Sequence, residues 1–253
     1  WNQSIVISGF MFLASKTMNT LPPDLEQFIT SGTAPIYIDL RSAVADSLQP
    51  HISLLINATH LTGLRAVIFV AEEECKSFHD DIPPNIYFLT SSLDQKLLRQ
   101  ISCVIHCGSI GLTTAVLAAG KPSVIVPFFR DQSFWATVIT KSGVGSGPVL
   151  LQTLTAQKLA TAIHTAIEPQ RVLKAISLGE EIQAEDGVSV AMISFHDQLL
   201  KYRLTCSINP TKTAAWKVSK TKIRLSSCAA AVLMGMGLLD FEKIDLYVQS
   251  LFV

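Results

Sequence analysis

Two short loops carry the residues whose types and spacing could bind a charged ligand. The first, His106–Thr114 (HCGSIGLTT), lies between an apolar run and a segment with helical spacing. Its small residues let the backbone approach a ligand closely, and the following helix presents unpaired N–H groups and the positive end of its dipole, which together bind phosphate. The Thr113 and Thr114 hydroxyls and the His106 imidazole can add donors. The loop therefore predicts an anion site, and a tight strand-to-helix turn around a satisfied histidine is the alternative.

The second loop, Pro127–Trp135 (PFFRDQSFW), follows another apolar run. Asp131 and Gln132 supply acceptors and donors suited to sugar hydroxyls, and Asp131 is also a residue type that caps helices. The two roles are compatible, and helix capping is the simpler interpretation of Asp131. Neither loop contains G-x-G-x-x-G or a Gly-Lys-Ser/Thr ending, so neither a dinucleotide fingerprint nor a Walker A loop is predicted.

Strands and helices must alternate along the chain to place both loops at one edge of a sheet. Short apolar runs rich in β-branched residues predict strands, and segments with helical spacing predict helices between them. This alternation indicates right-handed βαβ units and a parallel sheet, hence an α/β fold of the Rossmann-like, doubly wound type. Ligands bind beyond the carboxyl ends of such strands, where both loops begin. Strands are predicted at 35–40, 65–70, 85–89, 103–106 and 123–127, helices at 23–29, 46–62, 94–100, 111–119, 131–142, 155–167, 169–175 and 187–202, and an exposed acidic loop at 72–81.

The composition limits the classes of protein that fit. The chain has 253 residues and a mass of 27.5 kDa, and it is 49% hydrophobic and 16% charged, so it can bury a large core and is not disordered. Its 20 basic residues balance 20 acidic ones, and this neutrality argues against nucleic-acid binding. The longest apolar stretch, Cys228–Leu239, is about twelve residues long, which is too short to span a bilayer.

The five cysteines indicate a reducing compartment rather than a disulfide framework. Their number is odd, their spacing is irregular and none forms a C-x-x-C pair, so neither a zinc knuckle nor any other metal site is predicted. We expect buried, reduced thiols in a cytoplasmic protein.

Three parts of the chain are predicted. Residues 1–20 are apolar and irregular and are expected to connect domains, whereas residues 21–202 carry the alternation described above. Residues 203–253 break the alternation with a basic run, Lys212–Arg224, and an apolar stretch, which predict an appended helical element. Because the first residue is not methionine, we expect a fragment or a processed product.

Three segments resemble the donor-binding signature of UDP-sugar glycosyltransferases, in particular that of the sterol 3-beta-glucosyltransferases of fungi and plants. They are His106–Ala115, Ala118–Pro122 and Pro127–Trp135. The family pattern reads approximately H-H-G-G-A-G-T-T, a spacer ending in proline, and P-F-F-G-D-Q-x-F-W, with the spacing found here. The resemblance extends over roughly residues 1–202 and is strongest over 83–148. Residues 1–13 are similar to the family's interdomain linker and residues 35–42 to its first strand and Gly-Ser loop.

The resemblance implies the C-terminal, donor-binding half of a two-domain enzyme of the GT-B type. In that family the N-terminal half binds the acceptor and carries the catalytic histidine, so no catalytic residue is expected in this chain. The first loop and Ser42 would hold the pyrophosphate, Asp131 and Gln132 the sugar, and the strand end near Leu89–Ser91 the uracil. No D-x-D motif occurs, which fits a metal-independent site that takes UDP-sugar as substrate and needs no cofactor. The implied donor-binding residues are Ser42, His106, Gly108, Ser109, Gly111, Thr113, Asp131 and Gln132.

Five positions depart from the family pattern. Asp39, Arg41, Ser109 and Arg130 stand where glycine is usual, and Leu112 replaces a threonine. A lost hydroxyl bond to a charged phosphate costs about 1.5–3 kcal/mol, and a side chain where glycine had positive φ costs about 1–3 kcal/mol. The two arginines either reach the pyrophosphate as bidentate donors or obstruct it. Four lost glycines at one rim favour obstruction.

The sequence therefore predicts the nucleotide-sugar-binding half of a hexosyltransferase acting on a sterol or other lipophilic hydroxyl acceptor. The chain alone is expected to be inactive. One alternative is a non-catalytic, truncated or decayed copy with weak or no UDP binding, and another is one subunit of a split enzyme. A lipid acceptor would favour peripheral membrane contact.

Overall fold

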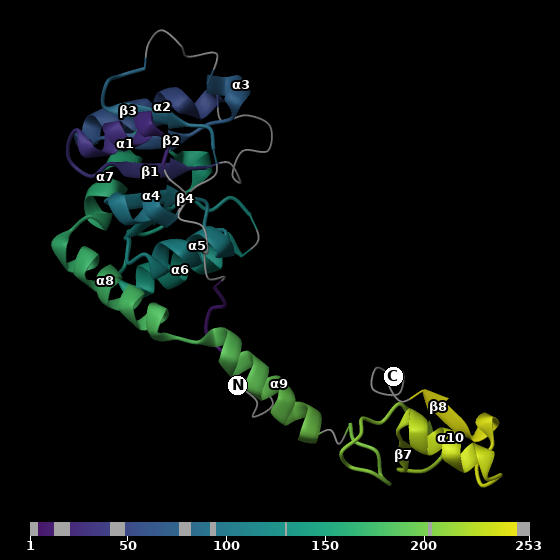
Figure 1. Ribbon diagram of the computed structural model, residues 1–253. Coiled ribbons are helices and arrows are strands. Elements are labelled where there is room, and N and C mark those ends of the chain that lie inside the picture. The colour runs from purple at the N-terminus through teal and green to yellow at the C-terminus, as the bar shows by residue number, and fades with distance from the viewer. Residues whose placement is uncertain are drawn as a thin grey trace. The chain divides into compact units, whose positions relative to one another are not determined.

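The computed structural model describes residues 5–12, 21–40, 49–75, 82–91, 95–129, 131–201 and 204–246. Contacts within the chain divide it into two compact units. One is Phe12–Glu185, and the other combines Trp1–Met11 with Asp186–Val253. Figure 1 shows the elements of both units.

A five-stranded parallel sheet forms the centre of the larger unit (Figure 1). Its order is β3-β2-β1-β4-β5, and every neighbouring pair is parallel. This order reverses between β1 and β4, which is the switch point of a Rossmann-like sheet. The predicted α/β, doubly wound fold is thereby confirmed. The strands are β1 (Ile36–Asp39), β2 (Ala66–Phe69), β3 (Ile86–Leu89), β4 (Cys103–His106) and β5 (Ser123–Ile125).

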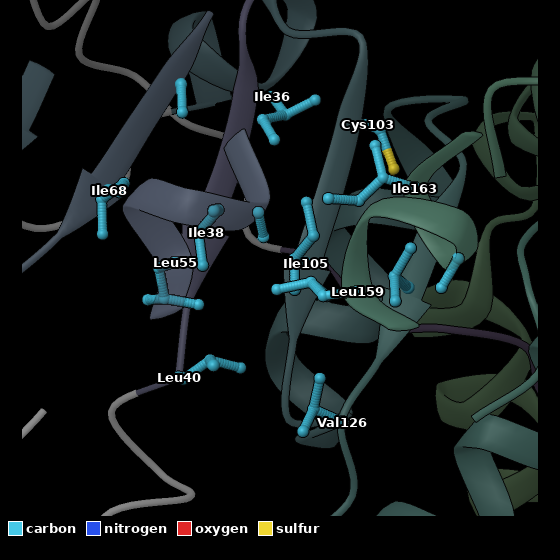
Figure 2. Packing of buried hydrophobic residues seen from close by; sticks show 14 of the residues in the cluster. Ile36, Ile38, Leu40, Leu55, Ile68, Cys103, Ile105, Val126, Leu159 and Ile163 are labelled. Carbon is cyan, nitrogen blue, oxygen red and sulfur yellow. The ribbon is translucent and has the colours of Figure 1, made fainter. Parts of the chain in front are cut away.

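Helices cover both faces of this sheet, which explains why its strands are continuous apolar runs rather than alternating ones. Helices α2 (Gln49–Thr62) and α7 (Ala156–Ala166) supply Leu55 and Leu159 to one apolar core, where they pack with Ile38 and Ile105 (Figure 2). Tyr37 points to the opposite face, because side chains alternate along a strand. That face is covered by α1 (Pro23–Thr30), α4 (Gln95–Gln100) and α5 (Ile110–Ala118).

The remaining helices of this unit differ from the predictions in two places. The acidic segment expected to be a loop begins as a short helix, α3 (Glu72–Cys75). Helix α8 (Pro169–Ala184) continues well beyond the predicted end at 175, because it packs along α5. A Cβ on Gly179 of α8 would lie 2.7 Å from the Gly120 Cα, so glycine allows this close approach. Helix α6 (Gln132–Ser142) and the short 3₁₀ helix η3 (Leu151–Thr153) complete the unit.

The second unit contains α9 (Gly187–Lys201) and a small antiparallel sheet of order β7-β6-β8. The predicted appended helical element is present in part, as α10, but the sheet beside it was not predicted. Strands of two or three residues are too short to show a period, and their partners lie far apart in sequence. The strands are β6 (Trp216–Val218), β7 (Arg224–Leu225) and β8 (Ile244–Leu246), accompanied by α10 (Ser227–Gly235) and the 3₁₀ helix η4 (Phe241–Lys243).

Residues 5–12 form neither helix nor strand. They pass close to the start of α9, where a Cβ on Gly187 would lie 2.3 Å from the Phe10 carbonyl oxygen. No helix in the described ranges is both long and apolar enough to cross a membrane.

Candidate functional site

The candidate site lies at the switch point of the parallel sheet. Asp39 ends β1 and His106 ends β4, and the two residues are direct partners in the parallel register. The His106–Thr114 loop follows β4 into α5, and the next strand, β5, leads towards α6. The two loops singled out from the sequence therefore begin at the same edge of the sheet, as predicted.

His106 is wholly buried, and its two ring nitrogens have different surroundings. Nδ1 accepts a hydrogen bond from the Gly108 backbone N–H at 3.1 Å, so the ring hydrogen of neutral His106 resides on Nε2. Nε2 is buried and has no hydrogen-bond partner among the described residues. Because buried donors in folded proteins are almost always paired, an Nε2–H without a partner suits an acceptor that binds from outside the chain.

Burial lowers the pKa of His106 to about 4, although the charge of Asp39 acts in the opposite direction. The imidazole is therefore neutral at pH 7 and acts as a directed N–H donor. The sequence left open whether His106 would supply an N–H or a positive charge, and this environment selects the N–H.

Gly108 makes the turn between β4 and α5 and needs to be glycine. Its φ is +88°, and a Cβ there would lie 2.9 Å from the Ile125 Cγ2 atom and 3.2 Å from the Gln132 carbonyl oxygen. The turn therefore packs directly against β5 and the start of α6. This contact brings the His106 loop and the Gln132 region together.

The start of α5 presents backbone donors. Ser109 is the N-cap residue, yet its side chain makes no capping hydrogen bond, so the first-turn N–H groups are left for another acceptor. Gly111 in this turn is exposed, and a Cβ built on it would meet nothing within 4 Å. An anion can thus approach the backbone here, which is the arrangement that binds phosphate.

The hydroxyl groups of the two threonines, which the sequence suggested as donors to an anion, donate to backbone carbonyls instead. The Thr113 hydroxyl donates to the Ser109 carbonyl at 2.8 Å, and the Thr114 hydroxyl donates to the Ile110 carbonyl. Thr113 is also wholly buried. Their hydrogens are used inside the helix, so Thr113 supports the first turn of α5 in this structure. Leu112, which replaces a family threonine, packs against the apolar core beneath α5.

The side chains of Asp131 and Gln132 also make different contacts from those that the sequence predicted. Asp131 is the N-cap residue of α6, but its side chain makes no capping hydrogen bond, so the capping interpretation is wrong. Its carboxylate is exposed. Gln132 is 3% exposed, and its Oε1 accepts from the Phe128 and Phe129 backbone N–H groups at 2.7 and 3.1 Å. Gln132 therefore fastens the loop between β5 and α6.

Three sequence-predicted positions, Ser42, Arg41 and Arg130, lie outside the described residues. The structure adds two features of the rim that the sequence did not reveal. One is the burial of the Asp39 carboxylate beside His106, since the sequence identified Asp39 only as a departure from the family pattern. The other is a group of exposed apolar side chains around the site, namely Ile110, Phe128, Phe129 and Phe134.

Several known proteins similar to this chain are glycosyltransferases. No family model matches it. A sterol 3-beta-glucosyltransferase of Arabidopsis thaliana is 27% identical over 199 residues, which cover 79% of this chain and 32% of the relative. Enfumafungin synthase of Hormonema carpetanum is 24% identical over 250 residues, which cover 97% of this chain and 19% of that protein. The chain thus spans a third or less of the length of these relatives.

Several solved structures of glycosyltransferases have folds similar to the fold of this chain. The glycosyltransferase of kitacinnamycin aligns with a TM-score of 0.59 at 17% identity, over 73% of this chain and 46% of that one. Os79 of O. sativa, solved in complex with UDP, aligns with a TM-score of 0.57 at 12% identity, over 70% and 45% of the two chains. Sheet order and these neighbours define a Rossmann-like α/β domain of the GT-B glycosyltransferase type.

Within that class, the sequence relatives identify the chain more narrowly. It is a homologue of UDP-sugar glycosyltransferases and is related to the sterol 3-beta-glucosyltransferases.

Proposed function

We propose that this chain supplies the nucleotide-sugar-binding half of a glycosyltransferase that moves a hexose from a UDP-sugar to a lipophilic hydroxyl acceptor. The observation that carries the proposal is the buried His106 side chain, whose Nδ1 is bonded to Gly108 while Nε2 has no partner among the described residues. A diphosphate oxygen bound at the start of α5 would accept from Nε2–H and from the first-turn N–H groups. Both kinds of donor lie at the switch point of the sheet, where such ligands bind.

The chemistry follows from where negative charge develops. An acceptor hydroxyl, deprotonated by a base, attacks the anomeric carbon, the bond from that carbon to the UDP oxygen breaks, and UDP leaves with the bonding electrons. Neutral His106 and the N-terminus of α5 would stabilise the departing diphosphate. With a pKa of about 4 and Nδ1 already bonded, His106 is unsuited to be the base. The base would therefore come from an acceptor-binding half.

The sugar would lie towards the start of α6. The exposed carboxylate of Asp131 can accept hydrogen bonds from sugar hydroxyls. Gln132 would act mainly by holding the loop that carries this carboxylate, since its amide oxygen is engaged by backbone N–H groups. The assignment of Ser42 to the pyrophosphate remains part of the proposal.

The acceptor we propose is a sterol or a related polycyclic alcohol. Exposed Phe128, Phe129 and Phe134 form an apolar rim beside the donor site, which suits a ring system better than a polar acceptor. The names of several relatives, which are sterol 3-beta-glucosyltransferases, agree with this acceptor class. A cytoplasmic location and a role in lipid glycosylation belong to the same proposal.

One observation favours a second candidate function, that of a non-catalytic copy with weak UDP binding. The Asp39 carboxylate is buried beside His106, where it would repel a diphosphate. Calorimetry tests the UDP site that both candidates share, and only a transfer assay separates them. Heat of binding with UDP at micromolar to low millimolar concentration supports the donor site, whereas no heat at millimolar UDP with folded protein refutes it. Adding an acceptor-binding half, together with a UDP-sugar and a sterol, then tests whether the chain supports transfer of the sugar.

A further inference from the structure

The C-terminal residues 204–246 leave unusual amounts of apolar surface exposed. Their fully buried apolar side chains are few and small, the largest being Leu225 and Ile244. By contrast Val232, Met236, Leu238 and Phe241 are between 55% and 68% exposed. Large contiguous apolar surfaces on soluble proteins mark sites that contact another molecule or a membrane.

These four side chains, called the apolar tip below, come from one continuous region. Val232 and Met236 are four residues apart on α10 and its C-cap, joined by the hydrogen bond from the Met236 N–H to the Val232 carbonyl. Leu238 follows a left-handed turn at Gly237, and its N–H returns to the Leu233 carbonyl. A shallow hollow joins the end of α10 to η4, and it is lined by the apolar Met234, Leu239 and Phe241 and by the charged Asp240, Glu242 and Lys243. Phe241 is anchored there by the Trp216 ring, with centroids 5.9 Å apart.

A basic hairpin lies beside the apolar tip. It consists of residues 217–224, which join β6 to β7 and contain Lys217, Lys220, Lys222 and Arg224 but no acidic residue. The Ser219 N–H donates to the Lys243 carbonyl at 2.8 Å, and Lys243 follows Phe241 by two residues. The turn of the hairpin is therefore held next to η4 and the apolar tip.

The hairpin carries more positive charge than its neighbouring strand offsets. Lys217 is the cross-strand partner of Arg224 on β7 and of Asp245 on β8, whereas Lys220 and Lys222 lie in the turn. Lys220 has a φ of +59°, a conformation that glycine or asparagine adopts more easily. Residues 204–246 contain six basic side chains and three acidic ones, which leaves an excess of three positive charges. Such an excess of positive charge is complementary to an anionic surface.

We propose that residues 204–246 dock the chain onto an anionic lipid membrane. The apolar tip would enter the boundary between headgroups and acyl chains, while Lys220 and Lys222 would contact the acidic headgroups. Exposed aliphatic and aromatic side chains beside lysines are the combination that binds membrane interfaces. A soluble polyanion would use the lysines but would leave the apolar tip in water. The inference does not depend on donor binding.

The test is sedimentation of the full chain with lipid vesicles. We expect at least tenfold stronger binding to vesicles that contain phosphatidylserine than to pure phosphatidylcholine vesicles, and weaker binding as salt is raised. Met236→Glu combined with Leu238→Glu should abolish binding to both. Lys220→Ala combined with Lys222→Ala should weaken binding to the anionic vesicles roughly 25-fold, because each lysine contributes about fivefold.

Matched controls come from the other unit. Leu173→Glu changes a side chain of α8 that is 67% exposed, and Lys141→Ala changes an exposed lysine of α6, so neither should alter vesicle binding. Circular dichroism and calorimetry with UDP should be unchanged in all these variants, which separates this inference from the proposed function. Absence of vesicle binding by the folded chain overturns the proposal. The proposal is also overturned if sedimentation velocity shows a dimer that the Met236 and Leu238 changes dissociate. The apolar tip would then contact a second copy of the chain.

Discussion

Asp39 and His106 are direct partners across the junction of β1 and β4, and both side chains are buried at the point where the strand order reverses. The pairing places a carboxylate beside a histidine whose Nε2 has no hydrogen-bond partner among the described residues.

Removing the Asp39 charge should tighten UDP binding. Asp39→Asn keeps the shape of the side chain but removes the repulsion between a buried carboxylate and a diphosphate. We expect affinity for UDP to rise roughly tenfold, equivalent to about 1.4 kcal/mol. Isothermal calorimetry measures it, with the exposed Asp197→Asn as a control that should change nothing. Weaker binding in Asp39→Asn would mean that the carboxylate positions His106 for the ligand instead.

Removing the His106 imidazole should weaken UDP binding. A hydrogen bond to a charged group contributes about 1.5–3 kcal/mol, so His106→Ala should lose between tenfold and a hundredfold in affinity. His164→Ala removes an exposed histidine of α7 and is the matched control. Equal affinities of the two variants would exclude His106 Nε2 as a diphosphate donor.

The two glycines of the β4–α5 loop should respond oppositely to alanine. Gly108→Ala places a Cβ against Ile125 and the Gln132 backbone at a φ of +88°, so it should destabilise the fold by about 3 kcal/mol in urea unfolding. Gly111→Ala meets no atom within 4 Å and improves helix propensity, so stability should stay level or rise by up to about 1 kcal/mol.

UDP affinity should nevertheless fall at least tenfold in Gly111→Ala, because the added methyl group occupies space next to the donors of α5. A variant that is both stable and fully competent in UDP binding would place the phosphate elsewhere.

Gln132 should matter for the loop between β5 and α6. Gln132→Ala leaves the Phe128 and Phe129 N–H groups without their acceptor, at a cost of about 1–3 kcal/mol in the free energy of unfolding. Gln132→Glu keeps an acceptor oxygen and should recover most of this loss. Thermal unfolding of both variants is the measurement, and an equal loss in each would show that the amide NH₂ group is the essential part.

Stability should fall between pH 6.5 and pH 4 because of His106. Its pKa is about 4 in the fold, against 6.5 for a free histidine, so the unfolded chain binds more protons in this range. The free energy of unfolding therefore rises with pH across the range, and His106 contributes about 3 kcal/mol of this rise. Urea unfolding at several pH values should show a shallower slope in His106→Gln than in the unchanged chain. Identical slopes would contradict the burial of a neutral imidazole.

Local patterns in the sequence were sufficient to predict the sheet and the edge at which the two candidate loops begin. The runs that became β1 to β5 are apolar throughout because both faces of the sheet are covered, and a strand buried on both faces can be recognised without knowing its neighbours. The loop after β4 was also recognisable, because its small residues directly follow a strand of this kind. Parallel strands then bring their carboxyl ends to one edge.

Only the tertiary structure decided what the polar groups at that edge do. Whether His106 donates or carries a charge depends on burial and on the Gly108 N–H, and whether Gln132 binds a ligand or a loop depends on where Phe128 and Phe129 place their N–H groups. The length of α8 and the sheet of β6, β7 and β8 likewise depend on partners distant in sequence. Periodicity records which side of an element is buried, whereas hydrogen-bond partners and burial of single polar atoms are set by contacts that form only when the chain has folded.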